Sequence, residues 1–292
     1  MRDAPLPFLS IVVPTRNRAR LLPDCVESLM RQDFPADRYE IIVVDDGSVD
    51  ETPRVVADIQ ARSNDPVLRY VRQSVGGLNV ARNAGLKVAE GDPILFVDDD
   101  VVAPPSWARA VAEGRLRHPG AGCFSGPVRL RLEGKAPRFC ANDGLDGELN
   151  LGDVERPVEA LIGANMTVRR GAIERIGMFN EALSGCGGGD ETEWVLRLLE
   201  TGGQVIYLPD AWVWHRRNAG DLRLWRILRK QFQRGREQVA FAKSVRQRMS
   251  LSQELGAIPR FIAHAVRRRC AGGLMSASIR AGRAWGLIRE RT

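Results

Sequence analysis

Three consecutive carboxylates, Asp98, Asp99 and Asp100, directly follow an apolar run at residues 94–97. A run this short, without polar interruption, is typical of a buried strand. Three like charges at one strand end repel one another unless a positive group lies among them. Mg²⁺ and Mn²⁺ suit such a position, because they prefer hard oxygen ligands and leave room for water and phosphate oxygens. The segment therefore predicts either a divalent-cation site or a solvated acidic loop.

A second acidic pair, Asp190 and Glu191, follows the three glycines at 187–189 and opens a predicted helix over 191–199. Acidic residues in a first helical turn complement the helix dipole and cap free amides, which is a purely structural role. Glycines, however, let the backbone approach a ligand closely. A carboxylate beside them is then placed to act as a general base.

His215 is one of three histidines and follows a predicted strand at 212–214. A single histidine at such a position often has a structural role. A neutral imidazole can also complete a coordination shell of carboxylate and phosphate oxygens. His215 is therefore a candidate third ligand beside the aspartates at 98–100.

The elements that must position these groups alternate between strand and helix. Strands are predicted at 8–13 (closed by Pro14), 40–44, 67–71 and 94–97, with helices at 21–30, from 51 and at 79–89. Strands separated by helices predict a parallel sheet covered on both faces. Such sheets bind ligands beyond the carboxyl ends of their strands. Thr15, Asp45 and Asp46 lie at these ends, where an aspartate can form a turn or accept hydrogen bonds from a nucleobase or ribose.

The rest of the chain is less regular. Candidate strands lie at 121–125, 159–162, 166–168, 204–208 and 212–214, and residues 133–157 are typical of a long surface loop. From residue 216 the pattern is helical, with breaks expected near Pro259 and near Gly272-Gly273.

The composition is that of a globular protein and not of a membrane-spanning or secreted one. The 292 residues are 44% hydrophobic and 27% charged, which is ordinary for a globular protein. Apolar runs are too short to cross a bilayer, and the start lacks the features of a signal peptide. Five cysteines without a CxxC pair predict reduced thiols, so a zinc site is not expected. These features favour a cytoplasmic protein.

Positive charge is concentrated in the last 77 residues. Residues 216–292 contain 19 of the 43 Lys and Arg residues but only four of the 36 Asp and Glu residues. Two interpretations remain open: a helical segment that lies on the anionic inner face of the cell membrane, or one that packs on the rest of the chain with its charges in water. Nucleic-acid binding is not expected, because no RNA- or DNA-binding motif is present.

Four segments in this order resemble the inverting family 2 glycosyltransferases: SIVVPTRNR at 10–18, EIIVVDDGS at 40–48, ARN at 81–83 and DDD at 98–100. The resemblance covers residues 8–215 and implies the GT-A fold. That is a mostly parallel, Rossmann-like α/β sheet flanked by helices, here with a basic helical C-terminal extension. The implied domains are 1–215, with a nucleotide-binding half at 1–104 and an acceptor-binding half at 105–215, and an extension at 216–292.

The resemblance also implies roles. Asp98 and Asp100 match the family's DxD motif, and with His215 they are the expected ligands of Mn²⁺ or Mg²⁺. Glu191 matches the catalytic base of a Gly-Glu-Asp motif, but the two acids stand in swapped order, so Asp190 remains an alternative. The residues expected to bind the nucleotide-sugar are Pro14, Thr15, Asn17, Asp46, Arg82, Asp98, Asp99 and Asn165, with Arg82 a surface charge in the alternative interpretation.

The predicted activity is transfer of a sugar from a nucleotide-sugar, with UDP-sugars favoured, to a carbohydrate or lipid-linked acceptor in the synthesis of cell-surface polysaccharide or glycoconjugate. One alternative is a nucleotidyltransferase that makes a nucleotide-sugar, although residues 14–18 lack the glycine-rich loop that such an enzyme needs after its first strand. The other is a non-catalytic protein that binds sugar nucleotides.

Overall fold

The computed structural model describes residues 5–62, 65–140, 145–183 and 190–289. The chain divides into two compact units. Unit 1 comprises Met1–Leu130, Gly147–Glu181 and Trp194–Arg216, and unit 2 comprises Arg131–Asp146, Ala182–Glu193 and Arg217–Thr292. The domain boundaries expected at residues 104 and 215 stay predictions.

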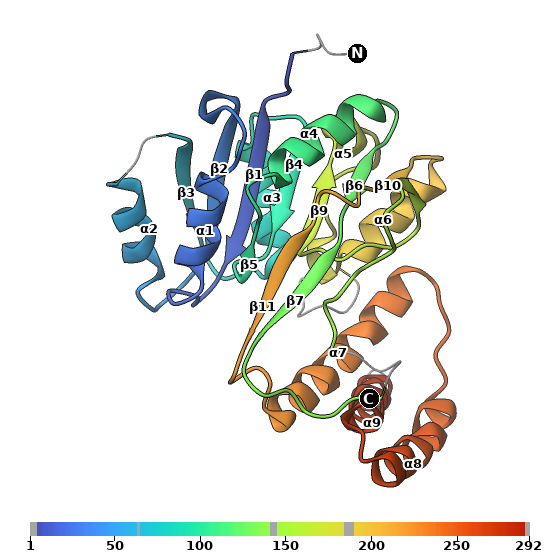
Figure 1. Ribbon diagram of the computed structural model, residues 1–292. Coiled ribbons are helices and arrows are strands. Elements are labelled where there is room, and N and C mark those ends of the chain that lie inside the picture. Colours follow the sequence, from blue (N-terminus) through green and yellow to red (C-terminus); the bar gives the residue numbers. More distant parts are fainter. Residues whose placement is uncertain (1–4, 63–64, 141–144, 184–189, 290–292) are drawn as a thin grey trace. The chain divides into compact units, whose positions relative to one another are not determined.

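An eight-stranded sheet forms the centre of unit 1 (Figure 1). Its order is β3-β2-β1-β4-β9-β6-β10-β8, and the first four of these strands are parallel. The antiparallel pairs are β4–β9, β6–β9 and β8–β10. The strands are β1 (Leu9–Thr15), β2 (Tyr39–Asp46), β3 (Val67–Gln73), β4 (Ile94–Val97), β6 (Cys123–Ser125), β8 (Arg156–Val158), β9 (Asn165–Val168) and β10 (Val205–Tyr207). The mostly parallel, helix-flanked sheet expected from the sequence is confirmed.

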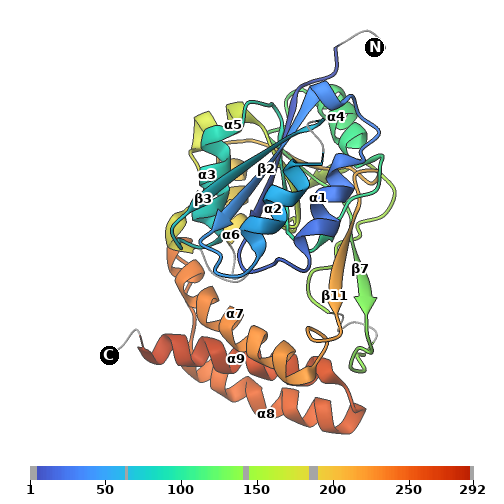
Figure 2. The same cartoon turned by 90° about the vertical axis from the view of Figure 1, so that its left-hand side faces the viewer.

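Helices cover both faces of this sheet. Successive strand residues point to opposite faces, so Ile11 and Val13 of β1 belong to one hydrophobic core and Val12 to the other. Figure 2 views the layers from the side. One core is shared with α1 (Leu22–Met30), α2 (Thr52–Gln60) and α4 (Trp107–Arg117), and the other with α3 (Leu78–Val88), α5 (Arg170–Ile176) and α6 (Asp190–Glu200). Two short 3₁₀ turns lie at Ala36–Arg38 and Glu181–Leu183.

Two strand predictions are wrong in detail. Residues 159–162 are not a strand; the strand in this region is β8, which ends at Val158, and the chain then turns so that the Asn165 amide bonds to the Ile162 carbonyl at 3.0 Å. Pro14 does not end β1 but lies inside it. The lost amide is tolerated there because the pairing of β1 with β4 stops at Val12.

A second, three-stranded sheet has the order β5-β11-β7. It contains β5 (Val101–Val102), β7 (Val128–Glu133) and β11 (Val213–Asn218). Strand β5 directly follows Asp100 in the chain. The residues of β11 that pair with β5 therefore lie close to the aspartates.

Three helices make up most of unit 2: α7 (Leu224–Ser244), α8 (Leu251–Arg268) and α9 (Ala271–Arg289). The break expected at Pro259 is wrong, because α8 continues through it. The proline cannot bond to the carbonyl of Leu255 one turn earlier, and Leu255 is 48% exposed. The break expected near Gly272-Gly273 is found two residues earlier, at Arg269 and Cys270, and both glycines lie in the first turn of α9. No helix in the described parts of the chain is both long and apolar enough to cross a membrane.

Glycines allow α7 and α9 to touch through their backbones. A Cβ atom on Gly235 would lie 2.0 Å from the Ile279 carbonyl oxygen, and one on Gly282 would lie 2.0 Å from that of Phe232. Side-chain adjustment cannot relieve a clash with backbone. The two helices must therefore separate if either glycine gains a side chain.

We expect Gly235→Ala to lower the free energy of unfolding by about 2–3 kcal/mol, as overpacking does elsewhere. Gly256→Ala in α8 is the matched control, because a Cβ there meets nothing within 4 Å. The control should be neutral or stabilising by up to about 1 kcal/mol, since alanine favours a helix more than glycine does. Urea unfolding of the two full-length variants measures both values. Equal effects would contradict the backbone contact.

Candidate active site

Asp98, Asp100 and His215 lie together in unit 1. One ligand atom from each of the three lies within 4.8 Å of the others, and His215 Nε2 is 3.0 Å from Asp100 Oδ1. The side chains of His215 and Asp100 are only 6% and 8% exposed. The structure thus brings together the three residues expected to ligate a metal, and that role stays a prediction.

The three-stranded sheet explains how His215 reaches the aspartates. Asp98 and Asp100 follow β4, and the chain then enters β5. The antiparallel ladder pairs His215 of β11 with Val101 of β5, and the Arg216 amide donates to the Asp100 carbonyl at 3.0 Å. The backbone of His215 is therefore held in place by the pairing of β11 with β5 and by the next amide along the chain.

The donor set fits a small divalent cation. The Gly147 carbonyl lies 3.3 Å from His215 Nδ1 and can only accept, so a proton on Nδ1 would be held there and the Nε2 lone pair would be left for a metal ion. Neighbouring ligands of an octahedral ion with bonds near 2.1 Å lie about 3.0 Å apart. The observed Nε2–Oδ1 distance matches this spacing. Two carboxylates and one imidazole suit Mn²⁺ well and Mg²⁺ acceptably.

Asp99 faces different partners. Its carboxylate accepts a hydrogen bond from Thr15 Oγ1 at 2.8 Å and lies 3.5 Å from Arg18 Nε. Burial raises the pKa of Asp99 to about 7; Arg18 opposes this rise, and the charge of Asp100 adds to it. Asp99 therefore joins the end of β1 to the acidic turn. Its expected contact with the nucleotide-sugar stays a prediction, as does that of Thr15.

The loops after β1 and β2 are bonded to each other. Asn17 adopts the left-handed conformation (φ 54°), which asparagine tolerates better than most residues. Its backbone amide donates to Ser48 Oγ at 2.9 Å, and its side-chain oxygen accepts from the Val49 amide at 2.8 Å. Asp45 accepts from the Ser48 amide and from the Tyr70 hydroxyl, which makes it a turn residue. Asn17 thus shapes this rim, and the contacts expected of Pro14 and Asn17 with a donor stay predictions.

Asp46 organises the loop that leads into α3. Its carboxylate accepts hydrogen bonds from Gln73 Nε2 and from the amides of Gly76 and Gly77, at 2.7–2.9 Å. A carboxylate offers about four acceptor directions, so these three bonds leave about one for a ligand. The expected contact of Asp46 with a nucleoside is compatible with this remaining direction.

Arg82 is only 2% exposed, so the alternative that it is a surface charge is wrong. Its guanidinium lies 5.6 Å from the centre of the Phe179 ring and donates to Asn79. Asn83 exchanges two hydrogen bonds with the backbone of Phe179, and Asn79 donates to the Asn180 carbonyl. The three α3 residues have the i, i+3, i+4 spacing of one helix face, and together they hold the segment 179–180. From the sequence, Asn83 was noted only within the ARN segment at 81–83, and no role was predicted for it or for Asn79.

Asn165 is buried between several elements. Its side-chain oxygen accepts from Trp107 Nε1 at 3.0 Å, and its amide nitrogen donates to the carbonyls of Pro127 and Ala211 at 3.2 and 2.7 Å. These contacts give Asn165 a positioning role within unit 1. Its predicted contact with the nucleotide-sugar is a further role that stays a prediction.

Asp190 and Glu191 form the first turn of α6. Asp190 is 2% exposed, whereas Glu191 is half-buried. Trp194, one turn later, is fully buried and donates from Nε1 to the Gly177 carbonyl at 3.0 Å, which anchors the helix. The glycine loop at 187–189 lies outside the described residues. The assignment of the base to Glu191 or Asp190 stays a prediction.

Comparison with known proteins adds a family match. The family model described as glycosyl transferase family 2 matches residues 10–177. Glycosyltransferase AglE of Haloferax volcanii is 27% identical over 240 residues, which are 80% of this chain and 74% of that protein. The uncharacterized glycosyltransferase EpsJ of Bacillus subtilis is 38% identical over 109 residues, 37% of this chain and 30% of that protein.

A third relative is the GalNAc(5)-diNAcBac-PP-undecaprenol beta-1,3-glucosyltransferase of Campylobacter jejuni, which is 41% identical over 96 residues, 32% of this chain and 30% of that protein. Several of the curated relatives with the strongest matches are aligned to this chain over less than a third of their own length.

Solved structures show the same fold. The mannosyltransferase PcManGT of Pyrobaculum calidifontis, in complex with GDP-Man and Mn²⁺, superposes with a TM-score of 0.70 at 22% identity, covering 99% of this chain and 92% of that chain. Staphylococcus aureus TarS 1–349 superposes with a TM-score of 0.53 at 17% identity, covering 97% and 92%. These likenesses establish a GT-A architecture.

Proposed function

The chain belongs to glycosyl transferase family 2, and we propose that it transfers a sugar from a nucleotide-sugar to an acceptor hydroxyl with inversion at the anomeric carbon. One observation supports the proposal most strongly. Asp98, Asp100 and His215 lie close together at the carboxyl end of β4, beside the end of β1. This is the position at which open α/β sheets bind ligands.

The donor side is assigned to unit 1. Asp98, Asp100 and His215 would hold Mn²⁺ or Mg²⁺, which supplies neutralisation of the negative charge that develops on the leaving diphosphate. The rim formed by Pro14, Thr15, Asn17 and Asp46 would orient the nucleoside. Asp99 and Arg82 would act on the sugar-diphosphate side, and Asn165 would lie on the sugar side.

The acceptor side requires a base. Glu191, or Asp190 in the alternative, would take the proton of the acceptor hydroxyl as its oxygen attacks the anomeric carbon. The bond from that carbon to the diphosphate oxygen breaks in the same step, and the electron pair leaves with the diphosphate. One such displacement inverts the configuration, and no covalent sugar–enzyme intermediate is needed.

The donor nucleotide can be tested directly. With Mn²⁺ present, we expect UDP-sugars to raise the melting temperature of the full chain more than GDP- or dTDP-sugars do. PcManGT was solved with GDP-Man and TarS 1–349 with UDP, so both nucleotides belong in the panel. Release of UDP from the stabilising donor supports transfer. Pyrophosphate release from a nucleoside triphosphate would instead indicate the nucleotidyltransferase, and binding without turnover of any donor the non-catalytic protein.

We further propose that unit 2 binds an anionic membrane surface, where a lipid-linked acceptor would be found. Leu255, Pro259, Ile262 and Val266 have the spacing of one face of α8, and the three aliphatic side chains are 48%, 44% and 73% exposed. Arginines at 260 and 267–269 are exposed on the same helix and its end. Each basic residue near such a surface contributes about 1 kcal/mol.

The double variant Ile262→Asp/Val266→Asp should reduce pelleting of the full chain with phosphatidylglycerol vesicles, because it places charge on the apolar stripe. Val49→Asp in unit 1 is the control, since Val49 is 90% exposed and lies in the loop between β2 and α2, not on α8. Binding should fall with rising salt and be weak to phosphatidylcholine vesicles. Equal pelleting of wild type and double variant would refute membrane binding by this face and favour helices whose charges simply face water.

A further inference from the structure

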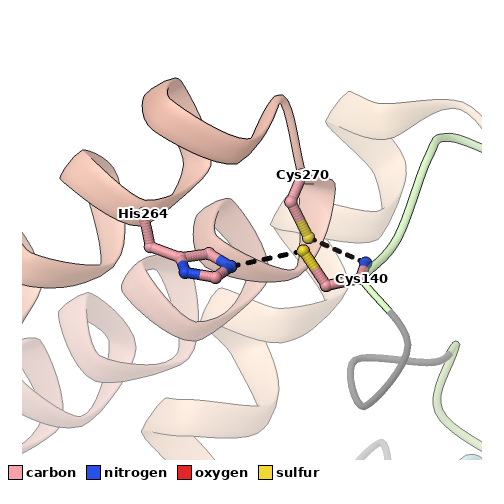
Figure 3. A group of neighbouring side chains, drawn as sticks. All are labelled: Cys140, His264 and Cys270. Atoms are coloured by element: carbon pink, nitrogen blue, oxygen red, sulfur yellow. Dashed lines mark hydrogen bonds between the residues drawn. The ribbon is translucent and has the colours of Figure 1, made fainter.

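Cys140, His264 and Cys270 of unit 2 form a second group of potential metal ligands. One ligand atom from each of the three lies within 4.8 Å of the others. Figure 3 shows the imidazole and the two thiols pointing toward one another. The group is chemically unlike the acidic site of unit 1, because it offers two soft sulfur ligands and one nitrogen.

We propose that Cys140, His264 and Cys270 bind a zinc ion, with water in the fourth position. The distances support a tetrahedral ion: zinc bonds of about 2.3 Å to sulfur and 2.05 Å to nitrogen place these two ligand atoms about 3.6 Å apart. The observed distance between Cys140 Sγ and His264 Nε2 is 3.5 Å. Thiolate and imidazole together select zinc over Mg²⁺ or Mn²⁺.

The end of α8 is shaped to bring two of the ligands together. Arg269 adopts the left-handed conformation (φ 47°), which is strained for a residue with a side chain. The Cys270 amide then bonds to the Ala265 carbonyl at 3.1 Å, and the Arg269 amide to that of Val266 at 3.5 Å. This pair of bonds is a Schellman motif, usually built on glycine. It turns the chain back so that Cys270 faces His264 of the preceding turns.

The third ligand comes from a distant segment. The Arg138 carbonyl accepts from the Ala271 amide at 2.8 Å, which holds residues 138–140 against the start of α9. The Cys140 amide donates to Cys270 Sγ at 3.0 Å. Amide hydrogen bonds to sulfur are common around metal-bound thiolates and stabilise their charge. The sequence spacing did not predict this group, because its ligands come from segments far apart in the chain and not from a CxxC pair.

The three ligands come from two segments of unit 2 that are far apart in the sequence. Bound zinc would cross-link residues 138–140 to the junction of α8 and α9. This cross-linking role would not depend on sugar transfer.

The test is the zinc content of the full chain, purified under reducing conditions without chelator. We expect about one zinc ion per chain by inductively coupled plasma mass spectrometry. Cys140→Ser, Cys270→Ser and His264→Gln should each lose it. Cys123→Ala and His118→Gln are matched controls that remove a thiol or an imidazole elsewhere and should retain it. Asp100→Asn should also retain it, which separates this site from the acidic one.

A cobalt spectrum of the wild-type chain provides a readout that does not depend on any variant folding. Co²⁺ at the site should give thiolate-to-metal charge-transfer bands and the strong visible bands of tetrahedral cobalt. Three results would overturn the proposal: reduced wild type that takes up neither metal, zinc that persists in both cysteine variants, or a native disulfide between Cys140 and Cys270 found by peptide mapping.

Discussion

Asp100→Asn is expected to lower sugar-transfer turnover by about 10²–10³-fold, and to raise the Mn²⁺ concentration needed for half-maximal activity. Asparagine has nearly the same shape but no charge, so it weakens both the hold on a cation and the neutralisation of the diphosphate. Folding should be retained, because the Arg216 amide bonds to the backbone carbonyl of Asp100 and not to its side chain. Initial rates at several Mn²⁺ concentrations, with circular dichroism of both proteins, measure these effects.

The matched control for Asp100→Asn is Asp33→Asn. Asp33 is an aspartate of unit 1 whose carboxylate is 71% exposed and pairs with Arg109 on the surface. Its replacement removes the same charge at an exposed position that is not a proposed ligand, and should leave turnover and the Mn²⁺ requirement unchanged. Asp100→Asn with wild-type rates and an unaltered Mn²⁺ requirement would refute the proposed metal site, whereas loss of circular dichroism would assign Asp100 to folding.

The sequence predicted the first half of the sheet well because burial leaves a clear pattern there. The strands β1, β2 and β4 are buried on both faces, so their residues form continuous apolar runs that end at polar residues. The same rule predicted that Thr15, Asp46 and Asp98 would share one rim. Short strands were harder: β8 has three residues, one of them Pro157, and lies at the sheet edge where neither length nor pattern marks it.

Side-chain contacts of the site could be predicted only in part. That His215 lies beside Asp100 depends on a two-residue ladder between β5 and β11, which no periodicity can indicate. Arg82 could be placed on a helix from the sequence, but its burial depends on Phe179. The arrangement of the proposed zinc ligands depends on the left-handed conformation of Arg269. It could not be predicted, because an arginine gives no sequence signal for that conformation. The positions of His215, Arg82 and the proposed zinc ligands are therefore decided by tertiary contacts and not by local sequence patterns.

Glu191→Gln is expected to lower turnover by about 10²–10⁴-fold, the usual contribution of general-base catalysis, while donor binding stays nearly intact. The amide has the same size as the carboxylate but cannot take the acceptor proton. Glu191 is favoured over Asp190 because it is half-buried, whereas Asp190 is only 2% exposed and an acceptor must reach the base. Turnover and the donor-induced rise in melting temperature, measured on the same protein, separate chemistry from binding.

Asp190→Asn and Glu193→Gln complete the comparison, because all three acids lie in the first turn of α6 and each change removes one negative charge. Glu193→Gln should keep near wild-type turnover, since Glu193 is not a proposed base; its favourable interaction with the helix dipole is weakened by about 0.3–1 kcal/mol. Asp190→Asn should mainly reduce stability, because its carboxylate is buried at the helix start. If Asp190→Asn is inactive and Glu191→Gln is fully active, the base is Asp190. If all three variants lose turnover equally, the negative charge of the turn matters and no single acid is the proton acceptor.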